Sequence, residues 1–118
     1  MVETGNSSIL HAEMVAIALA QQILGTYDLA GGEKSYELVT STEPCSMCLG
    51  AIPWSGISRL VCGARGCDAE SIGFDEGIKP AKGVLSLEDK GITVVRDVLR
   101  DEALAVLEQY KQDGGKIY

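Results

Sequence analysis

The chain has 118 residues, a length that fits one domain, and 46% of them are hydrophobic, enough for a buried core. Ten Lys and Arg residues stand against 17 Asp and Glu residues, and the resulting net charge of −7 disfavours binding to nucleic-acid backbones. The longest uncharged apolar stretch, residues 14–24, is too short to span a bilayer, and the N-terminus has no features of a secretory signal. We therefore expect a cytoplasmic protein without a membrane partner, whose four cysteines are metal ligands or catalytic thiols.

Apolar runs and turn residues predict alternating helices and strands. In chain order these are a helix at 11–24, a strand at 36–41, a helix from 45 that ends between 53 and 56, a strand at 58–64, a short helix at 68–72, an irregular loop at 73–83, a strand at 91–96 and a helix from about 99. The last helix has an apolar stripe at residues 99, 103, 104, 106, 107 and 110. The alternation indicates an α/β fold with a mostly parallel sheet that is covered on both faces.

Three side chains in the patterns H-A-E and P-C-S-M-C have the chemistry of zinc ligands. Cys45 and Cys48 are three residues apart, so on the first turn of a helix both sulfurs face one side, and the helix N-terminus favours their thiolate form. His11 is the only histidine, and three protein ligands leave the fourth tetrahedral position for water. Zinc lowers the pKa of that water to about 7. Glu13, two residues from His11, is suited to move its proton to a substrate.

Other roles for these residues remain open at this stage. The pair Cys62-x4-Cys67 has a spacing that would let it join the C-x-x-C pair in a four-cysteine structural zinc site, although Cys62 lies in an apolar strand. A redox-active C-x-x-C pair is a second alternative, which gives no role to His11 or Glu13. An ordinary capping or core histidine at His11 is a third.

The pattern H-x-E followed by P-C-x-x-C resembles that of the cytidine and deoxycytidylate deaminase superfamily, and within it the guanine deaminases. The similarity runs from His11 to Tyr118. TSTEPCSMCLGAIPW resembles the family's cysteine helix, IGFDEG its substrate loop and KIY its C-terminal segment. The resemblance implies a three-layer α/β/α cytidine-deaminase-like sandwich, a single zinc-dependent deaminase domain over residues 1–118, and one zinc ion per chain.

The resemblance also implies a role for each site residue. The zinc ligands that it implies are His11, Cys45 and Cys48. Glu13 is implied as a catalytic proton shuttle, and Glu76 as a catalytic residue that contacts the purine and assists the release of ammonia. Substrate contacts are implied for the backbone N–H of Ala12, for Trp54 as a wall of the base pocket, and for Tyr118 as the residue that closes it.

The function that the resemblance implies is hydrolytic deamination of a purine-type base, most directly guanine to xanthine plus ammonia, in purine catabolism. Deamination of adenosine in tRNA, or of another nucleobase or an aminotriazine such as ammeline, is the alternative within this class. The implied partners are a small nucleobase and a second copy of the chain, in a homodimer that is domain-swapped through the C-terminal segment.

One feature departs from the family pattern. Only ten residues precede His11, so the family's N-terminal helix and β-hairpin have no counterpart, and we expect an N-terminally shortened deaminase. The strand at 36–41 would then be an uncovered sheet edge. A catalytically impaired, zinc-stabilised assembly domain is therefore an alternative of a different class.

Overall fold

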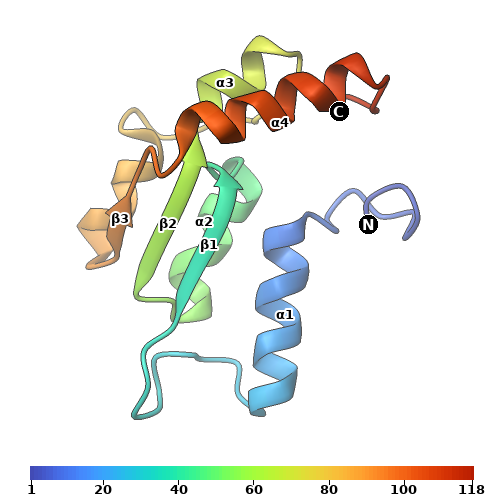
Figure 1. Ribbon diagram of the computed structural model, residues 1–118. Helices are drawn as coiled ribbons and strands as arrows, with labels where there is room; N and C mark the ends of the chain where they lie inside the picture. Colours follow the sequence, from blue (N-terminus) through green and yellow to red (C-terminus); the bar gives the residue numbers. More distant parts are fainter.

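The computed structural model describes residues 1–118 and contains a three-stranded sheet with helices around it (Figure 1). Its elements are α1 (Ala12–Leu24), β1 (Glu37–Thr42), α2 (Ser46–Ser55), β2 (Arg59–Ala64), α3 (Gly66–Ser71), the 3-10 helix η1 (Gly83–Lys90), β3 (Thr93–Val95) and α4 (Arg100–Gln112). Every predicted helix and strand is present within a few residues of its expected bounds. No helix combines the length and the apolar character that crossing a bilayer requires.

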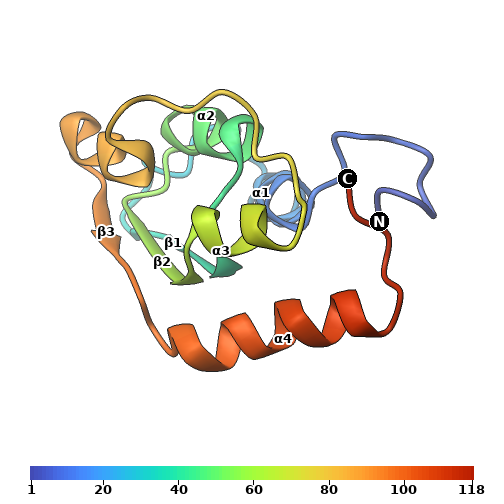
Figure 2. The same cartoon turned by 90° about the horizontal axis from the view of Figure 1, so that it is seen from above.

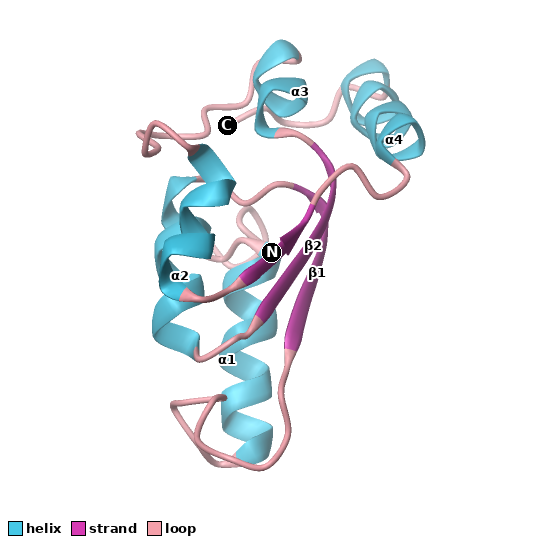
Figure 3. Cartoon of the chain, turned by 90° about the vertical axis from the view of Figure 1, so that its left-hand side faces the viewer, coloured by secondary structure: helices cyan, strands magenta, loops and turns pink.

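The three strands are parallel and lie in the order β1-β2-β3. Leu60 in β2 is paired with Leu38 in β1 on one side and with Val94 in β3 on the other. Helices α1 and α2 lie on one side of the sheet and α4 lies on the other, as Figures 2 and 3 show. This confirms the predicted three-layer α/β/α architecture. Because the strands are parallel, their carboxyl ends meet at one edge, the usual place of a ligand site in such sheets.

The hydrophobic core lies between the sheet and the layer that contains α1, α2 and η1. Ile52 of α2 and Leu60 of β2 have no exposed surface, and Ile17 of α1 and Leu87 of η1 belong to the same cluster. Full burial of a Leu or Ile side chain stabilises a fold by about 1.5–3 kcal/mol. This packing fixes the positions of α1 and α2 relative to the strands.

Helix α4 covers less of the opposite face than the sequence predicts. It contains no buried residue, and Leu99 and Val106 of its apolar stripe are 66% and 65% exposed. A hollow of about 390 Å³ lies between α4 and the sheet, where it is lined by Val39 of β1 and Val61 of β2. Amphipathic periodicity identifies the apolar face of a helix, but it does not say how much of that face a sheet will cover.

Helix η1 was not predicted, and it shortens the strand that follows it. Val84 and Leu87 are buried and lie three residues apart, which places them on one face of a 3-10 helix. Gly91, with a φ of 77°, ends this helix in the left-handed conformation that glycine adopts without strain. β3 therefore spans only Thr93–Val95, where a strand at 91–96 was expected.

Candidate active site

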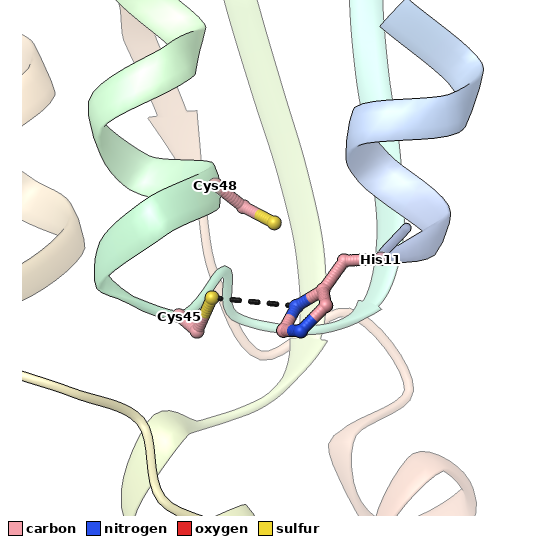
Figure 4. Close-up of side chains that lie close together, drawn as sticks. All are labelled: His11, Cys45 and Cys48. Carbon is pink, nitrogen blue, oxygen red and sulfur yellow. Dashed lines mark hydrogen bonds between the residues drawn. The ribbon is translucent and has the colours of Figure 1, made fainter. Parts of the chain in front are cut away.

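The candidate metal ligands come from the first residues of α1 and α2. His11 is the N-cap residue of α1, and Cys45 is the N-cap residue of α2, with an extended backbone at each position. Cys48 lies in the first turn of α2, on the side that faces α1 (Figure 4). The contact between the two helices thus brings together ligands that are 34 residues apart in the sequence.

The three donor groups converge as the donor set of a zinc ion would. They lie within 4.8 Å of one another, and Cys45 Sγ is 3.5 Å from His11 Nδ1 (Figure 4). Two donors held by one tetrahedral zinc ion at about 2.0–2.3 Å are about 3.5–3.8 Å apart, so the separation of Cys45 Sγ and His11 Nδ1 matches a shared zinc ion. Two thiolates and one imidazole form a common catalytic donor set, which leaves one coordination position for a water or substrate.

The two cysteines differ in their affinity for a proton. Hydrogen bonding with the Cys48 side chain lowers the pKa of Cys45 to about 5 against the effect of burial, and the backbone N–H groups of Cys48 and Met47 contribute in the same direction. The same hydrogen bond, burial and the nearby Glu13 carboxylate raise the pKa of Cys48. Both sulfurs must be deprotonated to bind a metal, so metal binding at this pair releases protons.

Glu13 lies beside this cluster, on the first turn of α1. The Cys48 thiol donates to Glu13 Oε2 over 3.7 Å, so the carboxylate reaches the candidate metal ligands. Glu13 also lines a hollow of about 310 Å³ between α1 and β1, together with Ala12 and Thr40. The backbone N–H of Ala12, at the first position of the helix, has no acceptor within α1. The Glu13 carboxylate, which can carry a proton, and the unpaired N–H of Ala12 thus line the same hollow.

The loop that contains Glu76 is attached to the helix that contains the cysteines. The backbone N–H of Ser46, next to Cys45, donates to the carbonyl oxygen of Glu76 over 2.8 Å. The Glu76 side chain is only 10% exposed and pairs with Lys79 at 3.2 Å. Burial raises the pKa of Glu76, while Lys79 acts in the opposite direction. The structure therefore brings Glu76 next to the start of α2, with a cation beside it.

The C-terminal residue lies against a candidate metal ligand of the same chain. The Tyr118 ring is 5.9 Å from the His11 ring and packs edge-on against Phe74 at 5.5 Å. The backbone N–H of Asp75 donates to the Tyr118 carbonyl oxygen over 3.1 Å. A single chain can therefore place Tyr118 beside its own His11, and domain swapping through this segment stays a prediction.

Trp54 lies apart from the candidate metal ligands within the chain, and its predicted role as a wall of the base pocket stays a prediction. It is 87% exposed and lies six residues beyond Cys48, which corresponds to about 9 Å along the axis of α2. It lines a different hollow, together with Tyr27 and Lys90 and without any of the candidate ligands. The sequence resemblance supplied the expectation for Trp54, and the length of α2 separates this residue from the cysteines.

The other two cysteines do not join the candidate ligands. The Cys62 thiol is buried in β2 and donates to the carbonyl oxygen of Val95 over 3.6 Å, and burial raises its pKa to about 11. Cys67 is exposed on α3. The group able to hold a metal consists of His11 and the C-x-x-C pair, which argues against a four-cysteine site.

Sequence reasoning missed three residues that organise the site. Lys79 pairs with Glu76, Phe74 contacts Tyr118, and Glu43 binds the neighbouring strand ends. Phe74 lies within the IGFDEG segment, which was a usable signal. A charged residue directly before the P-C motif was a weaker signal for Glu43, and no pattern marked Lys79.

Comparison with known proteins identifies the family. Residues 1–64 match the family model described as the cytidine and deoxycytidylate deaminase zinc-binding region, which is more than half of the chain. The chain belongs to this family of zinc-binding deaminase domains. It is 43% identical over 75 residues to a guanine deaminase of Bacillus subtilis, covering 64% of this chain and 46% of that protein. It is 44% identical over 62 residues to the tRNA-specific adenosine deaminase of the same organism, covering 52% and 36%.

Solved structures give the same assignment. A guanine deaminase from Nitrosomonas europaea matches with a TM-score of 0.91 and 49% identity, over 94% of this chain and 62% of that chain. A complex of the protein NE0047 with 2,6-diaminopurine matches with a TM-score of 0.93 and 50% identity, over 99% and 62%. A structure from work on tRNA:A34 deaminases has a TM-score of 0.65 and 25% identity, over 90% and 70%. The matches thus cover between 36% and 70% of the length of these relatives, and 46% and 62% of the two guanine deaminases.

Proposed function

We propose that this chain contains the catalytic centre of a zinc-dependent aminohydrolase that converts guanine to xanthine and ammonia. The proposal depends above all on one observation, the meeting of the His11, Cys45 and Cys48 donors with the Glu13 carboxylate. Similarity to guanine deaminases favours guanine over adenosine in tRNA, and the net charge of −7 opposes a tRNA partner. In this proposal, residues 1–118 act as one zinc-dependent deaminase domain.

His11, Cys45 and Cys48 would hold the metal, and Glu13 would move the protons. Zinc, when bound, lowers the pKa of a water to about 7 and so supplies hydroxide at neutral pH. Glu13 takes one proton of the attacking water and passes it to the ring nitrogen of the base. It then takes the remaining proton of the added hydroxyl group and passes it to the amine, which departs as ammonia as the carbonyl forms. The position of its carboxylate beside Cys48 supports this role, since it adjoins the ligands without belonging to the donor set.

Three further residues would orient the base. The free N–H of Ala12 is suited to donate to the purine carbonyl oxygen from the hollow beside α1. The Glu76 carboxylate is suited to accept from the amino group or a ring N–H, because carboxylates are strong acceptors. Tyr118, packed against His11, would cover the site and limit the entry of bulk water.

The cellular setting is part of the same proposal. We expect a cytoplasmic enzyme of purine catabolism that forms a homodimer. The unpaired outer edge of β1 and the exposed Tyr27 and Trp54 support association of two chains. Domain swapping is compatible with α4, which contains no buried residue, because its detachment from the sheet would expose little buried surface. Light scattering after size-exclusion chromatography would give the mass of the particle.

A parallel substrate assay tests the function. Zinc-loaded chain would be incubated with guanine, ammeline, adenosine, cytidine and a tRNA substrate, and released ammonia would be measured. We expect ammonia and xanthine from guanine, and their loss in Glu13→Ala although this variant still contains one zinc. Zinc content measured on the same samples separates a chemical defect from loss of the metal.

Other outcomes of the assay would assign the chain differently. Ammonia from the tRNA substrate alone, with binding that weakens as salt rises, would favour a tRNA adenosine deaminase. Ammonia from no substrate, with zinc bound, would favour a zinc-stabilised assembly domain. Undiminished turnover in Glu13→Ala would show that Glu13 does not carry the proton.

A further inference from the structure

The connection between β1 and the cysteine helix is very short. Only Glu43 and Pro44 lie between the last residue of β1 and Cys45. Pro44 is fully buried, and the backbone N–H of Glu43 donates to the carbonyl oxygen of Ala64 over 2.8 Å. Proline also restricts the backbone of the residue before it. The direction in which Cys45 presents its sulfur is therefore set by how these two residues are held.

The Glu43 side chain is held from two sides. Its Oε2 accepts from Arg96 Nε at 2.7 Å, and its Oε1 accepts from the backbone N–H of Gly66 at 3.1 Å. Glu43 is 7% exposed, and the Arg96 side chain is 27% exposed. Arg96 directly follows β3, and Gly66 is the first residue of α3, two residues after β2. One carboxylate thus joins the carboxyl ends of all three strands.

This arrangement has a cost that the fold must offset. A carboxylate removed from water is stable only when it is paired and its oxygens accept hydrogen bonds, and both conditions hold for Glu43. Hydrogen bonds between ionised groups are short and roughly twice as strong as neutral ones. The Glu43–Arg96 pair therefore fixes the short connection between the end of β1 and Cys45.

We propose that Glu43 and Arg96 are positioning residues for the metal centre, which hold Cys45 where its sulfur meets the Cys48 sulfur and the His11 imidazole. This inference rests on the zinc site of the proposed function. Without the Glu43 carboxylate, Gly66 N–H and Arg96 lose their acceptor and the short connection gains freedom. Metal binding must then order it again. Loss of such outer-sphere support weakens metal affinity about 10–100-fold.

Metal binding to the folded chain tests the proposal. Zn²⁺ affinity would be measured by competition with a chromogenic chelator, and Co²⁺-loaded protein would be examined for thiolate-to-cobalt charge-transfer bands. We expect Glu43→Gln to bind Zn²⁺ at least about tenfold more weakly and to give altered cobalt bands. Glu37→Gln is the matched control, because Glu37 and Arg59 form an exposed pair at the other end of β1 and β2, at 3.6 Å. This control should match the wild type.

A second variant separates positioning from general stability. Arg96→Met leaves the Gly66–Glu43 hydrogen bond in place and removes only the cation, so it perturbs the same ion pair from its other side. Its zinc affinity should fall in the same direction, and the double variant should be no weaker than the weaker single variant, because both act through one ion pair. Circular dichroism of the metal-free protein checks that each variant is folded.

The results distinguish this inference from the proposed function. Zinc affinity within twofold of wild type in both folded variants, with unchanged cobalt bands, would overturn the positioning role even if melting temperatures fell. A wild-type chain that binds neither Zn²⁺ nor Co²⁺ through thiolates would overturn the zinc site as well.

Discussion

Gly77 lies so close to Ser46 that a substitution there tests how closely the loop containing Glu76 packs against α2. Gly77 has a φ of 73°, and a Cβ there would overlap Ser46 Oγ and lie 3.1 Å from Ser46 Cβ. Gly25 has a similar φ of 68°, but a Cβ there would have nothing within 4 Å. The substitutions Gly77→Ala and Gly25→Ala therefore share the backbone cost and differ in the contact.

The two costs can be separated in magnitude. The left-handed conformation costs a residue with a Cβ about 1–2 kcal/mol, and alanine recovers about 0.4–1 kcal/mol by restricting the unfolded chain. Gly25→Ala should therefore destabilise by about 1 kcal/mol. An extra methyl in a filled space adds about 1–3 kcal/mol, so Gly77→Ala should cost about 2–4 kcal/mol in total.

Urea unfolding of the metal-free protein measures both values, and a second substitution tests their origin. Ser46→Gly removes the hydroxyl and the Cβ that the new methyl would meet. Gly77→Ala in that background should cost only about 1 kcal/mol, so the coupling energy should be about 1–3 kcal/mol. Equal costs for Gly77→Ala and Gly25→Ala, or no relief by Ser46→Gly, would refute the close attachment of the loop.

Three further predictions concern chemistry, acid stability and the metal. Glu13→Ala should lower kcat for guanine by about 10²–10⁴-fold with zinc retained, and equal rates in a steady-state assay would contradict the role of Glu13. Asp68 accepts two hydrogen bonds from Arg100, which hold the pKa of Asp68 below its usual value of 3.8. The pair thus stabilises the fold above that value and loses its effect as the pH falls through the lowered pKa. The difference between the urea midpoints of wild type and Asp68→Asn at pH 6 should therefore shrink as the pH falls below 3.8, and a constant difference would contradict the pairing. Free zinc at a thousandfold excess over its Kd should stabilise the folded chain by about 4 kcal/mol, and a chelator should reverse this shift in the urea midpoint.

The local parts of the fold could be predicted from the sequence because short-range patterns determine them. Gly25 ends α1 in the expected left-handed conformation, and the C-x-x-C spacing places both sulfurs at the start of α2. His11 could be assigned to the same site because it is the only histidine and the H-x-E pattern resembles that of the deaminases. The first two inferences needed only one or two turns of helix, whereas the assignment of His11 joins residues that are 34 apart and depended on the resemblance.

The remaining features depend on contacts between distant segments. Glu43 and Arg96 are 53 residues apart, and no periodicity links a residue after β1 with a residue after β3. The exposure of Val106 likewise depends on where α4 lies over the sheet, which amphipathic spacing does not determine. Trp54 lies beyond the reach of the cysteines within one chain, and its role at the base pocket stays a prediction.

The central claim is that His11, Cys45 and Cys48 hold one zinc ion. Its most direct test is the Co²⁺ absorption spectrum of three chains, namely wild type, Cys48→Ser and the matched control Cys67→Ser. We predict one Co²⁺ per chain with thiolate-to-cobalt charge-transfer bands in wild type and in Cys67→Ser, and reduced bands in Cys48→Ser. Bands that disappear in Cys67→Ser and persist in Cys48→Ser would contradict the claim.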